Sequence, residues 1–370
     1  MPADLLTPFA RIRVAMLSYR LPVSGEKRGG IERSAHTLAQ GLAGRGHHVV
    51  VFSHDDAPEH ASYEVRRLPW KRFVDTWVGT RVTMGYLGNV LALVPGYHEF
   101  DVIVAHGDSL LLPLTGKPVL RVMHGSGWGE AQSARTWGRR FLQYGVYAQE
   151  LLTAATQRGV VAVSENTRHD NRFVSHVIPH GVDNDVFRAA PGSKTAHPSV
   201  LFVGTLDGRK RGQFLVRAFL DVIRPAHPTA TLTVVGPEGP EYPGVTYRTG
   251  VSDETLAELY QRAWVYASPS TYEGFGLPYV EAMACGTVVV ATENPGSLEV
   301  LGNGEYGLIP DDSMFGVTVA RVLGDEPQRV ALAGRGLRRA AEFSLDAMVG
   351  RYEGLLMELA LGHARPVISR

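Results

Sequence analysis

Short apolar runs alternate along the chain with stretches of helical patterning. The runs are rich in β-branched residues, which is typical of the buried strands of a parallel sheet covered on both faces. In the first half the predicted strands are 12–18, 49–53, 63–68, 102–105, 119–123, 160–163 and 174–179, and the main helices are 31–45, 136–156 and 165–171. In the second half the predicted strands are 200–204, 231–236, 245–249, 264–268, 287–291 and 306–309, and the helices are 214–223, 255–263, 277–285, 314–323 and 328–342.

The alternation pauses once, over residues 180–198, where Pro191, Gly192 and Pro198 indicate a linker. At 370 residues the chain exceeds the roughly 250–300 residues at which single cores stop growing. The pattern therefore predicts an α/β protein of two doubly wound, Rossmann-like domains that face each other across a cleft. Ligands of such sheets bind beyond the carboxyl ends of the strands. We assign 1–180 to the first domain, 181–345 to the second, and 346–370 to a C-terminal helix that packs back on the first.

The most informative segment is 270–281, which holds Glu273 and Glu281 around a glycine-rich turn. It follows the predicted strand 264–268 and opens the predicted helix 277–285, so free N–H groups of the helix N-terminus point to an anion or a hydroxyl. Either glutamate alone is explained as well by a loop or a solvated helical charge. The pair, with this glycine spacing, favours a binding site.

Three other strand ends carry candidate chemistry. Gly29 and Gly30 precede a helix, where glycines allow backbone N–H groups to approach a phosphate, although a plain turn explains them equally simply. Arg209 and Lys210 follow strand 200–204, and such cations suit a diphosphate as well as they suit a solvated basic loop. His124 ends strand 119–123 and is predicted to face the cleft, where it can hydrogen-bond a substrate hydroxyl.

Composition narrows the class of protein. Lys+Arg and Asp+Glu are both 37, so no basic field predicts nucleic-acid binding. The only cysteine, Cys285, excludes an internal disulfide and a cysteine-built zinc site, and the histidines show no ligand spacing, so no metal is predicted. Residues 1–10 lack the pattern of a signal peptide, and no apolar run reaches the roughly 18 residues of a membrane span. These features predict a cytoplasmic protein.

One motif is misleading. Residues 302–307 satisfy G-x-G-x-x-G, but they precede a predicted strand instead of following one, so the dinucleotide-binding context is missing. We interpret this segment as a turn.

Motifs spread over nearly the whole chain resemble retaining glycosyltransferases of family 4. They are 29–32, 44–47, 163–165, 178–183, 203–206 with 209–210, 269–270, 273–286, 296–299 and 343–344. The resemblance implies a GT-B fold, a nucleotide sugar held mainly by the C-terminal domain, and no metal ion or other cofactor. Two residues depart from the family pattern: His180 stands where asparagine is common, and Thr205 where many members have a diphosphate-binding arginine. Arg209 is expected to compensate.

The same resemblance implies roles for individual residues. Glu273 and His124 are the expected catalytic residues, the first on the hydroxyls of the donor sugar and the second on the sugar or its oxocarbenium-like centre. Glu281 is expected to bind the ribose and Val251 the base. The diphosphate is assigned to Gly29, Gly30, Arg209 and Lys210, and further donor-sugar contacts are assigned to Gly274, Phe275, Gly276 and Leu277. Retention is expected to proceed by front-face attack, in which the departing phosphate takes the proton of the acceptor.

The acceptor is a hydroxyl compound whose class stays open. Stretches 66–73 and 135–141 interleave cations with aromatic residues, which suits an anionic membrane interface and a lipid-linked acceptor. A solvated loop and an amphipathic helix beside the pocket of a soluble acceptor are the alternative. Two other classes remain: a non-catalytic nucleotide-sugar-binding module and a GT-B phosphorylase, for which no pyridoxal-binding lysine context is found. The sequence leaves open the sugar, the base (UDP or GDP donors) and the oligomeric state.

Overall fold

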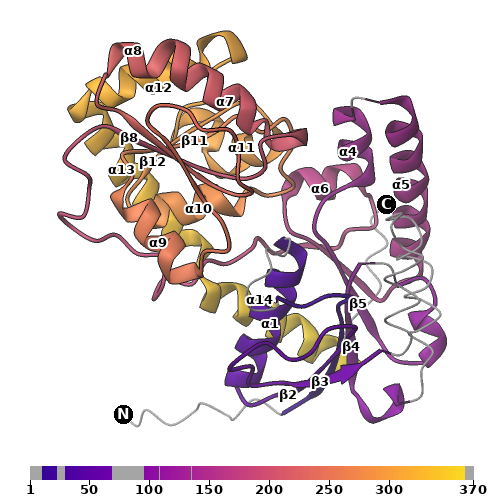
Figure 1. Ribbon diagram of the computed structural model, residues 1–370. Helices are drawn as coiled ribbons and strands as arrows, with labels where there is room; N and C mark the ends of the chain where they lie inside the picture. The colour runs from indigo at the N-terminus through magenta and orange to yellow at the C-terminus, as the bar shows by residue number, and fades with distance from the viewer. Residues whose placement is uncertain (1–10, 23–29, 69–95, 108, 135, 363–370) are drawn as a thin grey trace, which may run out of the picture.

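The chain folds into two parallel sheets, one in each half (Figure 1). The computed structural model describes residues 11–22, 30–68, 96–107, 109–134 and 136–362. The first sheet has the order β3-β2-β1-β4-β5-β6-β7 and the second the order β10-β9-β8-β11-β12. The strands are β1 Arg13–Leu17, β2 His48–Ser53, β3 Glu64–Arg67, β4 Val102–His106, β5 Val119–Met123, β6 Gly159–Ala162, β7 His176–Val177, β8 Ser199–Val203, β9 Thr231–Val235, β10 Val245–Arg248, β11 Val265–Ser268 and β12 Val288–Ala291.

Helices cover both sheets, and this confirms the predicted architecture of two doubly wound domains. Strands β4, β5, β11 and β12 are buried along their whole length, as expected for sheets enclosed on both faces. The helices are α1 Gly30–Gly44, α4 Gly127–Ser133, α5 Trp137–Thr156, α6 Glu165–Asp170, α7 Gly212–Ala218, α8 Arg224–Ala226, α9 Asp253–Arg262, α10 Leu277–Ala284, α11 Pro295–Val300, α12 Phe315–Gly324, α13 Glu326–Ala340 and α14 Leu345–Ala360.

The last described helix, α14, returns to the first sheet and packs against α1 and β4 (Figure 1). Its buried Glu353 accepts a hydrogen bond from Arg45, just beyond α1, and lies 2.8 Å from Nε2 of His47. The chain thus crosses between the two lobes twice, once near residue 182 and again near residue 344, where Val182 and Ser344 form a parallel bridge.

One predicted strand is wrong, and the short helices α4, α8 and α11 were missed. Residues 306–309 form no strand, because only Leu308 pairs with Val290 and the following Pro310 has no N–H to continue the ladder. The missed helices have at most seven residues, too few to produce a helical period in the sequence. The predicted helix 214–223 is α7 continued by a π-helical turn, Phe219–Ile223.

Candidate functional site

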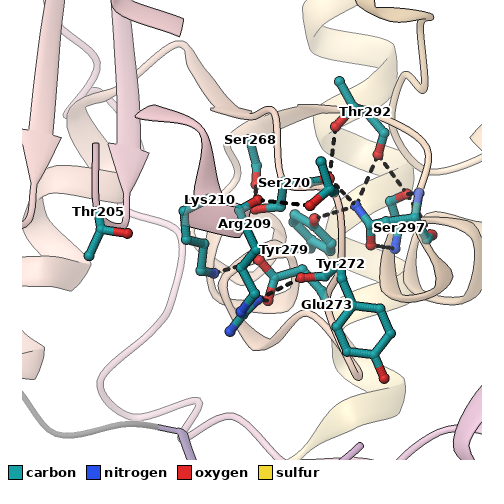
Figure 2. Close-up of polar contacts among 12 residues, drawn as sticks. Thr205, Arg209, Lys210, Ser268, Ser270, Tyr272, Glu273, Tyr279, Thr292 and Ser297 are labelled. Atoms are coloured by element: carbon teal, nitrogen blue, oxygen red, sulfur yellow. Dashed lines mark hydrogen bonds and ion pairs between the residues drawn. The ribbon is translucent and has the colours of Figure 1, made fainter. Parts of the chain in front are cut away.

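Glu273 lies at the centre of a charged cluster beyond the carboxyl ends of β8 and β11 (Figure 2). Lys210 Nζ is 2.6 Å from one carboxylate oxygen, and Arg209 Nη1 is 2.8 Å from the other. The two cations end the 3₁₀ turn Gly208–Lys210, which follows β8, whereas Glu273 follows β11. Because β8 and β11 are neighbours in the sheet, residues more than sixty positions apart meet at this edge.

The charges of this cluster do not cancel. Burial alone would raise the pKa of Glu273, but Lys210 and Arg209 outweigh burial and hold the pKa at about 2. The side chain is therefore a carboxylate at neutral pH, with both oxygens engaged by cations. Two cations and one carboxylate leave one positive charge in excess, and Arg209 is still partly exposed. Such a cluster can accept an anionic group through charge-assisted hydrogen bonds.

The turn between Glu273 and α10 requires its glycines. A Cβ on Gly274 would lie 2.5 Å from the carbonyl oxygen of His124, so this loop approaches the first domain at backbone distance. Gly276 has φ of 96° and forms the N-cap of α10, a left-handed conformation that disfavours other residues. Leu277 and Pro278 then start the helix, as predicted, and Phe275 packs edge-on against His180.

A network of buried polar residues fixes the backbone of this turn through hydrogen bonds (Figure 2). Asn294 donates to the backbone oxygen of Ser270 and to the hydroxyl of Tyr279, and it caps α11 through a reciprocal bond with Ser297. The N–H of Gly296 donates to the backbone oxygen of Glu273. These bonds fix the backbone of Glu273, so its carboxylate is presented in one orientation.

Glu281 belongs to a second, separate set of contacts. It lies on α10 with its side chain 2% exposed, and Tyr260 of α9 donates to Oε2 at 3.1 Å. Arg33 of α1, from the other lobe, places Nη1 3.4 Å from Oε1 and also pairs with Asp253 at 3.0 Å. Burial raises the pKa of Glu281, and Arg33 opposes that rise. The two glutamates therefore have different partners and different electrostatic environments.

His124 is the middle ring of three histidines. Its ring centroid lies 5.2 Å from that of His106 and 5.3 Å from that of His180, and His106 Nδ1 is 2.9 Å from His124 Nε2. Burial lowers the pKa of His106 to about 3 and that of His180 to about 4, and it holds the pKa of His124 well below its usual value. With pKa values lowered in this way the three rings favour the neutral form, in which His124 can offer a hydrogen bond but no positive charge.

The remaining predicted residues are less tightly grouped. Gly30 is exposed at the first position of α1, and Gly29 lies outside the described residues. Val251 is half-buried, next to Ser252, which caps α9. Thr205, which replaces the arginine of many family members, bonds the backbone oxygen of Asp207, and its side chain stands apart from the cluster in Figure 2.

Two cavities border these residues. One of about 450 Å³ is lined by Thr205, Leu206, Asp207, Gly208, Pro237 and Glu238, at the ends of β8 and β9. The other, of about 330 Å³, lies between the lobes and is lined by residues that include Arg33, His180, Asp253 and Glu281. Within the described ranges, no group of three or more His, Cys, Asp and Glu side chains is placed to hold a metal ion.

Sequence reasoning missed Arg33 and His106. A signal existed for each: Arg33 lies in the first turn of its helix, where the helix dipole disfavours a cation, and His106 ends β4, beside β5, which His124 directly follows. The first signal is local, but the partners of Arg33 and the pairing of His106 with His124 depend on which elements are neighbours in space.

Family models match both halves of the chain. Residues 28–186 match the model described as Glycosyltransferase Family 4, and residues 197–325 match the model described as Glycosyl transferases group 1. The chain belongs to glycosyltransferase family 4. The resemblance drawn from the motifs is thereby confirmed, and this family 4 glycosyltransferase is an enzyme.

Curated relatives agree with this assignment. A D-inositol 3-phosphate glycosyltransferase from Mycolicibacterium smegmatis is 29% identical over 329 residues, covering 80% of this chain and 69% of the relative. An MMP alpha-(1->4)-mannosyltransferase from Mycolicibacterium hassiacum is 28% identical and covers 90% of this chain and 94% of the relative.

Solved structures confirm the GT-B fold. Sucrose-phosphate synthase from Thermosynechococcus elongatus superposes with a TM-score of 0.75 at 22% identity, covering 95% of this chain and all of the other. HepE from Anabaena, in complex with UDP and glucose, superposes with a TM-score of 0.70 at 18% identity, covering 94% of this chain and 99% of that one. At these identities the likeness establishes the fold alone.

Proposed function

We propose that this glycosyltransferase moves a sugar from a nucleoside-diphosphate donor to a hydroxyl acceptor, with retention of configuration and without a metal ion. The observation that carries the proposal is the pairing of Arg209 and Lys210 with a buried carboxylate at the carboxyl ends of β8 and β11. Cations fixed in this way stabilise the negative charge that grows on the departing diphosphate, at no cost of reorganisation during the reaction. The complex of HepE with UDP and glucose supports a donor of this class.

The environment of Glu273 supports front-face transfer over a covalent intermediate. Its oxygens are engaged by Lys210 and Arg209, and its pKa of about 2 makes it a weak base and a weak nucleophile. In the proposed reaction the acceptor oxygen forms a bond to the anomeric carbon while the bond from that carbon to the β-phosphate oxygen breaks. The acceptor proton passes to the phosphate that leaves. Glu273 orients the sugar hydroxyls, and Glu281 accepts hydrogen bonds from the ribose.

The donor proposal predicts selective stabilisation by one nucleoside diphosphate. Thermal unfolding is followed with UDP, GDP, ADP or dTDP, because a ligand at one hundred times its Kd stabilises the folded state by about 2.7 kcal/mol. One diphosphate should raise Tm by several degrees with EDTA present, and the matching nucleotide sugar should be hydrolysed or transferred. No shift with any of them would reject the donor proposal. A shift without turnover would favour the non-catalytic binding module, and bound pyridoxal absorbance would favour the phosphorylase.

For the acceptor, we propose presentation at an anionic membrane surface, through α5. Trp137 and Phe141 are 83% and 82% exposed, and Leu152 continues the same exposed side of the helix. Arg139 is exposed next to them, and Arg140 lies over the Trp137 ring. Aromatic residues interleaved with arginines suit the headgroup region of anionic lipids.

The other predicted stretch supports this proposal less. Residues 69–73 lie outside the described residues, whereas Arg66 and Arg67 are engaged in ion pairs with Glu64, Glu99 and Asp56. No helix among the described residues is long and apolar enough to cross a membrane.

Replacing Trp137 and Phe141 together with alanine should abolish most binding to vesicles. Cosedimentation at low salt with phosphatidylglycerol vesicles should recover the wild-type protein, and with phosphatidylcholine vesicles it should recover much less, because the arginines need anionic headgroups. The matched control is Val330→Ala, which removes an apolar side chain that is 66% exposed on α13 of the other lobe. Wild-type protein that stays in the supernatant with anionic vesicles would refute the membrane proposal.

A further inference from the structure

Arg33 connects the two lobes of the enzyme at the carboxylate assigned to the ribose. It projects from the first turn of α1, and its guanidinium reaches both Glu281 on α10 and Asp253, the first residue of α9. The distances are 3.4 Å and 3.0 Å, and the side chain of Arg33 is 32% exposed. One side chain of the first lobe therefore contacts two separate elements of the second.

The position of Arg33 is unfavourable for its own helix. A cation in the first turn opposes the helix dipole, and an acidic or neutral side chain would stabilise α1 more. Within the part of the chain that the structure describes, the anions that pair with Arg33 lie on the other lobe, more than two hundred residues away along the chain. The contacts of Arg33 are therefore directed to the cleft between the lobes and not to α1.

Glu281 needs such a partner. Its side chain is buried, and among the described contacts its oxygens are approached only by the Tyr260 hydroxyl and by Arg33. A buried carboxylate without a cation tends to take up a proton, and a protonated carboxyl would donate a hydrogen bond where it should accept one. Arg33 lowers the pKa of Glu281 against the effect of burial. Each carboxylate oxygen has two lone pairs, so both retain acceptor capacity for a ligand.

Asp253 adds a second connection. It directly follows Val251 and Ser252, the loop assigned to the nucleobase, and it lines the same interlobe cavity of about 330 Å³ as Arg33 and Glu281. A guanidinium donates through a rigid planar fork, so binding to both carboxylates at once fixes their separation. Arg33, a residue of the opposite lobe, thus fixes the position of the loop assigned to the base relative to the carboxylate assigned to the ribose.

We propose that Arg33 is a positioning residue for the donor: it holds Glu281 as an oriented carboxylate for the ribose hydroxyls and ties the Val251–Asp253 loop to the first lobe. This inference rests on the proposed ribose contact of Glu281. It assigns to the first lobe a part in nucleotide recognition, which makes donor affinity depend on closure of the cleft.

The test measures how strongly the enzyme distinguishes a ribose from a deoxyribose. Isothermal titration gives Kd for UDP and for 2′-deoxy-UDP, or for the same pair of the base that the thermal screen selects. The wild type should prefer the ribonucleotide about tenfold, the value of one hydrogen bond to a charged group. Arg33→Ala should raise Kd for the ribonucleotide about tenfold and remove most of this preference, whereas Arg33→Lys should restore part of it.

The matched control is Arg45→Ala. Arg45 follows the other end of α1 and also joins that helix to a distant element, through Asp346 and Glu353 of α14, but away from Glu281. It should leave the ratio of the two Kd values unchanged. If Arg33→Ala kept the wild-type ratio of the two Kd values, the inference would be wrong. It would also be wrong if Arg45→Ala lost that ratio to the same degree as Arg33→Ala. If the alanine variant fails to fold, Arg33→Gln is measured in its place.

Failure of the ribose proposal gives a different result. If the wild type does not distinguish the two nucleotides, or if Glu281→Gln keeps the wild-type ratio, then Glu281 does not bind the ribose. If Glu281→Gln loses the ratio and Arg33→Ala keeps it, the ribose site stands and only the role of Arg33 is rejected. A double variant that behaves like either single variant would confirm that the two residues act as one unit.

Discussion

Replacing Glu273 with glutamine should reduce kcat by about 10³-fold or more, while Kd for the nucleoside diphosphate stays within about threefold of the wild type. Glutamine has nearly the same shape, but it cannot hold Lys210 and Arg209 as a carboxylate does, and one of its two oxygen acceptors becomes a donor. The sugar hydroxyls then lose an oriented acceptor in the transition state. The phosphates should bind as well as before, because both cations are released to them. Steady-state kinetics with the nucleotide sugar and titration with the diphosphate separate these two effects.

Glu281→Gln is the control for this prediction, since it removes the other carboxylate of the same segment. It should mainly raise Kd for the diphosphate and change kcat much less, because its contacts are with Tyr260 and Arg33 and not with Lys210. Thermal unfolding of both variants without ligand checks that they fold. If Glu273→Gln lost binding and turnover to the same degree, the assignment of Glu273 to the sugar would be wrong.

The strand pattern and the glycine turn were predictable because both are local. The strands that lie in the interior of the sheets are short apolar runs, and α10 begins and ends within one residue of the predicted helix. The glycine turn could be recognised because Gly276 must adopt a positive φ. Local patterns of this kind depend on the period of side chains along a strand or helix, and the sequence contains that information directly.

The partners of the candidate residues were not predictable in the same way. Glu273 pairs with Lys210 and Arg209 because β8 and β11 are adjacent, although β9 and β10 separate them in the chain. His124 lies between His106 and His180 for a similar reason, since all three follow or end elements of the first sheet. The contacts of Arg33 with Glu281 and Asp253 depend on how the two lobes face each other. Such contacts follow from strand order and lobe orientation, which the hydrophobic pattern does not specify.

Strand order also changes the interpretation of the two glutamates. Seven residues apart in sequence, they could form an acid and base pair, as in glycoside hydrolysis. In the structure Glu273 pairs with Lys210 and Arg209, whereas Glu281 pairs with Arg33. The two cations lower the pKa of Glu273 to about 2, whereas burial raises the pKa of Glu281. Two carboxyl groups with different partners are suited to binding two parts of one ligand.

Replacing Lys210 with alanine should reduce kcat/KM by about 10³-fold and make the remaining activity sensitive to acid. In the wild type, burial raises the pKa of Glu273, but Lys210 and Arg209 together bring it to about 2, below its ordinary value of 4.5. The wild-type activity should therefore show no loss from protonation of Glu273 between pH 5 and pH 8. Without Lys210 the effect of burial is opposed by Arg209 alone, so the pKa rises and Glu273 is protonated at a higher pH. On the acid side of the pH profile, kcat/KM should begin to fall at a higher pH in Lys210→Ala than in the wild type. In Lys210→Arg that pH should return toward the wild-type value.

The free energy of unfolding should depend on pH in the same direction as the activity. A carboxylate whose folded pKa lies below its unfolded value stabilises the fold fully above the unfolded value, and it loses that contribution as the pH falls toward the folded pKa. Lys210→Ala removes part of this contribution at pH 7, which urea unfolding should show as a loss of about 1–3 kcal/mol. Arg211→Ala is the control, because Arg211 is the next residue but pairs with Asp312 and lies over the Phe214 ring, away from Glu273. If Arg211→Ala moved the acid limb as far as Lys210→Ala, the effect would come from the net charge of the loop. A shift confined to Lys210 variants would identify its ion pair with Glu273 as the contact that keeps the carboxylate ionised for the donor sugar.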